Sequence, residues 1–194
     1  MPYSAPVADY LFIFNKIVNF KQLTQEDRFS EVTMDLVAAI LEEAGKISTE
    51  VLAPLQRVGD TNPAFLENGV VRTSPGFGKA YQSIADNGWI GMAASSEYGG
   101  MGLPQSLMHA VNEMMGGACL SLQLNPVMTQ GQIEALEHHA SEDLKKLYLP
   151  KLISGEWSGT MNLTEPHAGS DVGALKSVAV PNEDGSYSVS GQKI

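Results

Sequence analysis

The chain has 194 residues, of which 43% are hydrophobic and 18% charged, so collagen-like, low-complexity and wholly disordered chains are excluded. Twelve Lys and Arg against 22 Asp and Glu give a formal net charge of −10, which disfavours nucleic acid and anionic membranes as partners. The single cysteine, Cys119, excludes an internal disulfide and a cysteine-rich metal site.

The N-terminus lacks the pattern of a secretory signal. Its first apolar cluster, residues 11–14, is only four residues long and no basic residue precedes it. No stretch approaches the roughly 20 apolar residues that span a bilayer. We therefore expect a soluble, cytoplasmic protein.

Apolar spacing predicts helices along the first half of the chain. One amphipathic helix is expected over residues 8–19, and a long helix over residues 29–55, with Pro54 and then Asn62-Pro63 marking its end. A loop rich in Gly and Pro is expected up to Gly78. A short helix over residues 76–87 then stops at Gly88, since glycine commonly follows the last turn of a helix.

The same pattern continues to residue 153. Residues 95–102 contain three glycines and predict a loop. Pro104 suits the first turn of a helix that runs to about Gln123, and Asn125-Pro126 is expected to break it. Two further helices are expected over residues 127–139 and 142–153, with Ser141 as the N-cap of the second.

The pattern changes after Gly155. Residues 157–163 predict an extended segment, and residues 177–180 and 187–189 predict strands joined by a connection over 181–186. Two or three strands do not form a stable sheet alone, so we expect the chain to end part-way through a β domain. The expected domains are an N-terminal extension with the first long helix (1–60), a helical domain (61–155) and the start of a β domain (156–194).

Residues 161–171, MNLTEPHAGSD, form the segment richest in chemistry. Thr164 offers a hydroxyl and an amide at a turn that Pro166 fixes, and Gly169 permits a close approach of the backbone to a ligand. Ser170 and Asp171 add polar groups. The segment suits a flat heteroaromatic ring or a diphosphate. The simpler alternative is a turn in which Thr164 and Asp171 cap their own backbone.

Four motifs resemble motifs of the acyl-CoA dehydrogenase family and occur in the same order along the chain. Residues 164–171, TEPHAGSD, closely resemble the family signature TEP-x-AGSD. Residues 148–156, YLPKLISGE, are similar to the run just upstream of it. Residues 97–103 are similar to the family's glycine loop, and residues 187–193 to the strand that leads into its second flavin-contacting segment.

The resemblance implies a mainly α fold, in which a helical N-terminal domain is followed by the first strands of a β-barrel domain. It implies FAD as the cofactor, with Met161, Leu163 and Thr164 lining the flavin and Gly169 in the same loop. Thr164 would hydrogen-bond the pyrimidine edge. Ser170 would reach the flavin or the pantetheine of the substrate, and Pro166 and His167 would hold the turn.

The implied reaction is α,β-dehydrogenation of an acyl-CoA thioester. A carboxylate base removes the α-proton and the β-hydride passes to FAD. The family's base lies in a C-terminal domain, so no catalytic residue is expected in this chain, and Glu165 is expected to belong to the turn. The resemblance also implies an electron-transfer flavoprotein as electron acceptor and a homo-oligomer at full length.

Residues 1–20 look like the extension found on one branch of the family, which includes enzymes acting on methylthio-propionyl-CoA. The simpler alternative is an amphipathic segment that covers an apolar patch. Other candidate residues favour structural roles. His138-His139 predicts a solvated helix face rather than a metal site, Cys119 a buried small residue, and Met114, Met115 and Met128 packing residues.

Two other functions stay open at this point. An acyl-CoA oxidase shares these motifs and differs in its reactivity with oxygen. A helical module that binds an acyl group or a partner without chemistry would belong to a different class.

Overall fold

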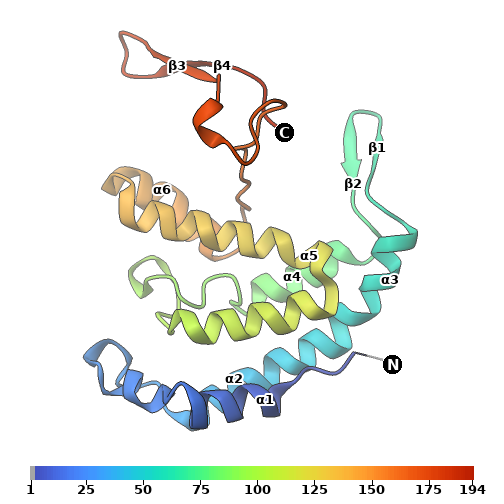
Figure 1. The fold of residues 1–194 in the computed structure, drawn as a ribbon, viewed down its shortest axis with the longest axis vertical. Coiled ribbons are helices and arrows are strands. Elements are labelled where there is room, and N and C mark those ends of the chain that lie inside the picture. The colour runs from blue at the N-terminus through green and yellow to red at the C-terminus, as the bar shows by residue number, and fades with distance from the viewer. Residues whose placement is uncertain (1–2) are drawn as a thin grey trace. The chain divides into compact units, whose positions relative to one another are not determined.

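The computed structural model describes residues 3–194 and divides into two compact units, one up to Gly159 and one over Thr160–Ile194. The first unit is a helical bundle, and the second contains a two-stranded hairpin with the loops around it (Figure 1). The predicted mainly α class is confirmed. Within residues 3–194, no helix combines the length and the apolar character that crossing a membrane requires.

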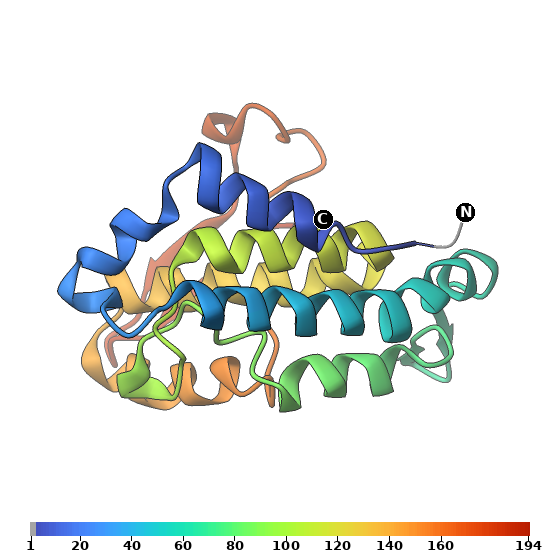
Figure 2. The ribbon, with the colours of Figure 1, turned by 90° about the horizontal axis from the view of Figure 1, so that it is seen from below.

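The N-terminal segment contributes side chains to the core of the first unit. Helix α1 (Val7–Phe12) continues as a π-helical turn (Ile13–Ile17), so the predicted helix over 8–19 is present in two parts. Two 3-10 turns follow (Phe20–Gln25 and Asp27–Phe29). Tyr10, Phe14 and Phe20 are buried, and the last two rings lie 4.7 Å apart between centroids. Helix α1 lies along α2 (Figure 2).

The predicted helix over 29–55 is wrong at both ends. Helix α2 (Met34–Lys46) begins after Thr33, whose hydroxyl accepts a hydrogen bond from the Leu36 amide at 3.2 Å. A π-helical turn (Ile47–Leu52) then leads into α3 (Ala53–Thr61). Pro54 lies in the first turn of α3, directly after the π-helical turn. This proline therefore does not end the helical run, which continues to Thr61, just before Asn62-Pro63.

The loop expected up to Gly78 contains a β-hairpin. Strand β1 (Phe65–Glu67) pairs antiparallel with β2 (Val70–Arg72) through a turn at Asn68-Gly69. Both turn residues have positive φ, 51° and 79°, as a type I′ turn requires. The Asn-Gly pair is a strong hairpin signal that the sequence prediction overlooked.

Helix α4 (Phe77–Asp86) ends before Gly88, whose φ of 73° suits the end of a helix, as predicted. Residues 95–102 form the expected loop, with one 3-10 turn at Ser96–Tyr98.

Helix α5 (Gln105–His139) consists of two limbs that fold back on each other. The break lies at Cys119, whose φ of −154° and ψ of 85° are not helical, and not at Asn125-Pro126 as predicted. The limbs are antiparallel (Figure 1), since Asn112 Nδ2 donates to Gln130 Oε1 at 2.7 Å. Two glycines of low helix propensity, Gly116 and Gly117, precede the break.

Helix α6 (Glu142–Ile153) packs against α5. Ser141 is its N-cap residue as predicted, but its side chain makes no capping hydrogen bond, and only its carbonyl accepts from the Lys145 amide at 3.0 Å. Side chains of α2, α4, α5 and α6 form one buried cluster whose largest fully buried members include Leu41, Ile84, Leu107, Met114, Met115 and Leu149.

In the second unit, β3 (Val178–Pro181) pairs antiparallel with β4 (Tyr187–Ser190), with Val178 opposite Ser190 and Pro181 opposite Tyr187. This confirms the predicted hairpin. A 3-10 turn (Val172–Ala174) precedes it. Residues 157–163 have no regular secondary structure.

Candidate functional site

The segment over residues 164–171 folds into a tight turn around Glu165. The Glu165 amide donates to the Ala168 carbonyl at 2.9 Å, and the Ala168 amide donates back to the Glu165 carbonyl at 3.0 Å. Pro166 lies at the second position of this turn, where its fixed φ is favourable. The backbone of the turn is therefore closed by its own hydrogen bonds.

The Glu165 carboxylate is buried and fully engaged. Its side chain is 2% exposed. It accepts hydrogen bonds from the Lys176 amide at 2.8 Å, the Ser177 amide at 3.0 Å and Lys193 Nζ at 2.9 Å. His167 Nε2 lies 3.5 Å from Glu165 Oε2 and 3.1 Å from the Ala174 carbonyl oxygen.

These neighbours keep Glu165 ionised. The Ser177 hydroxyl beside the carboxylate, the Lys176 amide and the Lys193 ammonium hold the pKa of Glu165 well below its ordinary value of 4.5, although burial opposes them. An ion-paired carboxylate of such low basicity is a poor acceptor for a substrate proton. Glu165 therefore holds the segment in place and does not suit the role of a base.

The predicted cofactor residues lie around this anchored turn and remain accessible. Met161 and Leu163 are 70% and 44% exposed. The hydroxyls of Thr164 and Ser170 and the carboxylate of Asp171 make no hydrogen bond within the part of the chain that the structure describes. The alternative of a turn capped by Thr164 and Asp171 is therefore wrong.

Backbone donors are also available at this segment. Among residues 3–194, the amide N–H groups of Thr164, Gly169 and Ser170 have no partner. A Cβ atom added at Gly169 would meet only Thr164 Cγ2, at 3.9 Å. Glycine is thus not needed here for the fold of the chain itself, which is the expected situation where a ligand lies against the backbone.

The segment combines exposed apolar side chains with unpaired amide and hydroxyl donors on a fixed backbone. An aromatic ring with polar atoms on one edge fits this set, since the ring faces suit Met161 and Leu163 and the edge accepts hydrogen bonds. The residues present therefore fit a flavin, which is the cofactor that the resemblance implies.

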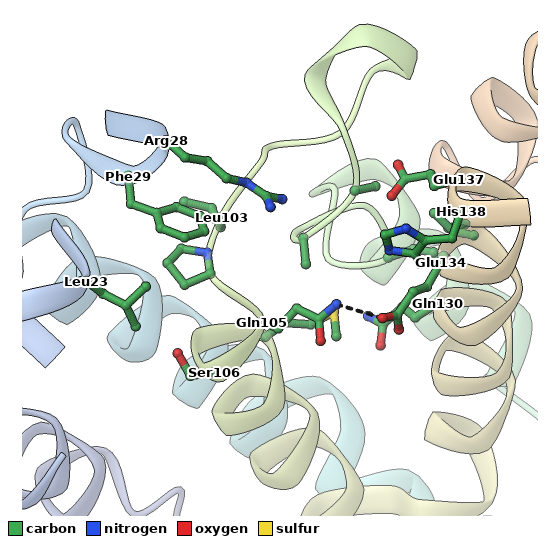
Figure 3. Close-up of a pocket in the computed structure, with 16 residues that line it drawn as sticks. Leu23, Arg28, Phe29, Leu103, Gln105, Ser106, Gln130, Glu134, Glu137 and His138 are labelled. Atoms are coloured by element: carbon green, nitrogen blue, oxygen red, sulfur yellow. Dashed lines mark hydrogen bonds between the residues drawn. The ribbon is translucent and has the colours of Figure 1, made fainter. Parts of the chain in front are cut away.

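The first unit contains a separate cavity of about 400 Å³. Figure 3 shows Arg28 and Phe29 on one side and Glu134, Glu137 and His138 on the other. Glu134 Oε1 accepts from Gln105 Nε2 at 3.2 Å, and Glu137 Oε1 accepts from the Ser95 amide at 2.7 Å. These bonds fix the wall of the cavity.

The histidines, the cysteine and the methionines considered in the sequence lie on the helix surface or in the interior of the first unit. His138 and His139 are exposed, and the described residues contain no group of three or more His, Cys, Asp or Glu that could hold a metal ion. Cys119 is buried. Met114 and Met115 lie in the core, and Met128 is partly buried.

Comparison with known proteins identifies the family. Residues 39–156 match the family model described as "Acyl-CoA dehydrogenase, N-terminal domain". The chain belongs to the acyl-CoA dehydrogenase family.

Two curated relatives of this family match nearly the whole chain. A 3-methylmercaptopropionyl-CoA dehydrogenase from Ruegeria pomeroyi is 44% identical over 194 residues, which are 100% of this chain and 33% of the relative. A butyryl-CoA dehydrogenase from Syntrophomonas wolfei is 32% identical over 196 residues, covering 98% of this chain and 32% of the relative. The chain thus spans about a third of the length of these relatives.

Solved structures of acyl-CoA dehydrogenases share the fold. Butyryl-CoA dehydrogenase from Megasphaera elsdenii superposes with a TM-score of 0.68 at 22% identity, covering 82% of this chain and 40% of that one. A glutaryl-coenzyme A dehydrogenase bound to glutaryl-CoA gives 0.68 at 26% identity, covering 81% and 38%.

The sequence analysis did not single out Lys193. Its side chain contacts residues 28 and 30 positions earlier, and no local pattern indicates such a contact. The sequence offered only a general hint. If Glu165 is buried, its carboxylate requires a partner, and no cation lies close to it along the chain except His167.

Proposed function

We propose that this chain forms part of an FAD-dependent acyl-CoA dehydrogenase that oxidises the α,β bond of an acyl-CoA thioester. The observation that carries this proposal is the anchored segment over residues 161–170, with its unpaired donors and exposed apolar side chains, in a chain of this family.

The proposed roles follow the chemistry of each side chain. Met161 and Leu163 would contact the ring, and the Thr164 hydroxyl and amide would donate to the pyrimidine edge. Gly169 would let the backbone approach closely, and Ser170 would bind either the flavin or the pantetheine of the substrate. FAD, when bound, supplies the acceptor for the hydride from the β-carbon.

The proton chemistry requires a base, and we propose that this base lies outside the 194 residues. The nearest candidate in the segment, Glu165, is already paired with Lys193 and with two amides. The task of this part of the protein would be to orient the cofactor and to stabilise negative charge on its reduced form through Thr164.

We propose a short acyl chain as the substrate, with 3-methylmercaptopropionyl-CoA as the first candidate. The relative of that name is 44% identical across the whole chain, against 32% for the butyryl-CoA dehydrogenase. Family membership further supports an electron-transfer flavoprotein as electron acceptor and a homo-oligomeric full-length protein. We also propose a cytoplasmic location.

The test uses the full-length protein under anaerobic conditions. We expect 3-methylmercaptopropionyl-CoA to bleach the flavin absorbance at least as fast as butyryl-CoA, and long-chain acyl-CoA to act more slowly. A flavoprotein that no acyl-CoA reduces would contradict the activity. Faster bleaching by long chains would contradict only the proposed substrate.

A further inference from the structure

Two segments far apart in the sequence are joined at the candidate cofactor site. Lys193 Nζ donates to the Leu163 carbonyl at 3.1 Å and to Glu165 Oε1 at 2.9 Å. The Ile194 amide donates to the Thr164 carbonyl at 2.9 Å. Lys193 and Ile194 together therefore bind one oxygen atom in each of the three consecutive residues 163–165.

These contacts use carbonyl and carboxylate oxygens of the segment as acceptors. They do not involve the N–H and O–H donors of Thr164. The carbonyls of Leu163 and Thr164 are occupied, whereas the amide and hydroxyl of Thr164 have no partner in the described part of the chain. Holding both carbonyls limits rotation of the peptide planes on either side of Thr164. The direction in which its donors point is thereby fixed.

The lysine also balances a buried charge. The Glu165 side chain is 2% exposed and that of Lys193 is 30% exposed, so the carboxylate is buried and its partner reaches it from the surface. Removing one partner of a buried pair leaves the other uncompensated and favours rearrangement of the surrounding backbone. Any such rearrangement acts directly on Leu163 and Thr164, because Lys193 bonds to the first of these.

We propose that Lys193 is a positioning residue, which orients the Thr164 donors toward the flavin by bridging the Leu163 carbonyl and the Glu165 carboxylate. This inference rests on the proposed function, since FAD is the ligand that these donors would meet. Lys193 acts through Leu163 and Thr164 and makes no contact with the cofactor itself.

The test measures FAD binding and the flavin reduction potential in the full-length protein carrying Lys193→Met. Loss of hydrogen bonds to a charged donor should weaken FAD binding about tenfold. The potential should become more negative, because the reduced ring loses a well-aligned donor. Lys193→Arg, which keeps a cation able to reach two acceptors, should restore most of both properties.

Lys176→Met is the matched control. Lys176 contributes only its backbone amide to Glu165, and that amide survives the substitution. We expect wild-type affinity and potential in this variant, and a melting temperature of the apoprotein equal to that of the wild type.

The outcomes separate this inference from the proposed function. A wild-type protein that does not bind FAD would contradict the function itself. A protein that binds FAD, with Lys193→Met equal to wild type in affinity and potential, would overturn the role of Lys193 alone. If Lys193→Met does not fold, Lys193→Gln, which keeps one uncharged donor, replaces it under the same criteria.

Discussion

At the scale of single residues, the buried Glu165 carboxylate anchors the segment that contains the candidate site. The sequence placed this glutamate in the turn, and the structure adds the reason, which is a set of donors from Lys176, Ser177 and Lys193. The motif predicts Thr164 and Gly169 as cofactor residues, and these roles stay predictions. The partners of Glu165 were not predictable, because they come from residues 11, 12 and 28 positions away.

The low pKa of Glu165 predicts a specific pH dependence of stability. A carboxyl whose pKa is lowered by folding contributes stability above its ordinary pKa and loses it as the pH falls toward the folded value. The basic side chains facing it are those of Lys193 and His167. Hydrogen-exchange protection of the Ser177 amide should therefore be constant above about pH 5 and should fall below about pH 4.

Glu165→Gln provides the comparison. This variant should show weaker protection of the Ser177 amide at neutral pH and should lack the drop at acid pH. A wild-type protection that is unchanged down to pH 3, or an identical acid drop in the variant, would contradict the assignment of Glu165 as the titrating group.

At the scale of elements, local signals predicted the existence of helices better than their ends. The predicted break at Asn125-Pro126 failed, since the chain turns at Cys119, after two glycines. Pro54 was expected to help end a helix, but the helical run continues through it to Thr61, just before Asn62-Pro63. A proline in a sequence establishes only that one backbone N–H is missing and that φ is fixed. Packing of the surrounding chain then decides whether a helix starts, continues or stops at that position.

The two N-cap positions give a matched test. The Thr33 hydroxyl accepts from the Leu36 amide, whereas Ser141 makes no side-chain capping bond. Thr33→Ala should lower the free energy of unfolding by about 1 kcal/mol. Ser141→Ala should change it by less than about 0.5 kcal/mol. Urea titration measures both, and equal losses would contradict the difference in capping.

At the scale of the whole chain, the order of a helical unit followed by strands was predictable from the change in periodicity after Gly155. The hairpin over β1 and β2 was missed although Asn68-Gly69 signalled it. The hairpin over β3 and β4 was expected, and the structure shows that both of its faces are apolar and exposed. Val178 and Val180 lie on one face, and Tyr187 and Val189 on the other.

This surface predicts self-association of the 194-residue chain produced alone. Exposed strands with unpaired edges and apolar faces readily pair with other copies. Light scattering should show species larger than a monomer, and Val189→Lys should reduce them. Gln25→Lys, which adds the same charge at an exposed position in the first unit, should have little effect. A monodisperse wild-type monomer would contradict the prediction.

The central claim is that the backbone near Gly169 lies against FAD, and the dissociation constant of FAD from the full-length Gly169→Leu variant tests it most directly. A Cβ atom at Gly169 would make only an ordinary contact with Thr164 Cγ2, at 3.9 Å, and we expect the apoprotein to melt as the wild type does. FAD binding should weaken at least tenfold, since the added side chain would occupy the place of the ring. Unchanged FAD binding in a normally folded variant would show that the cofactor, if the protein holds one, lies elsewhere.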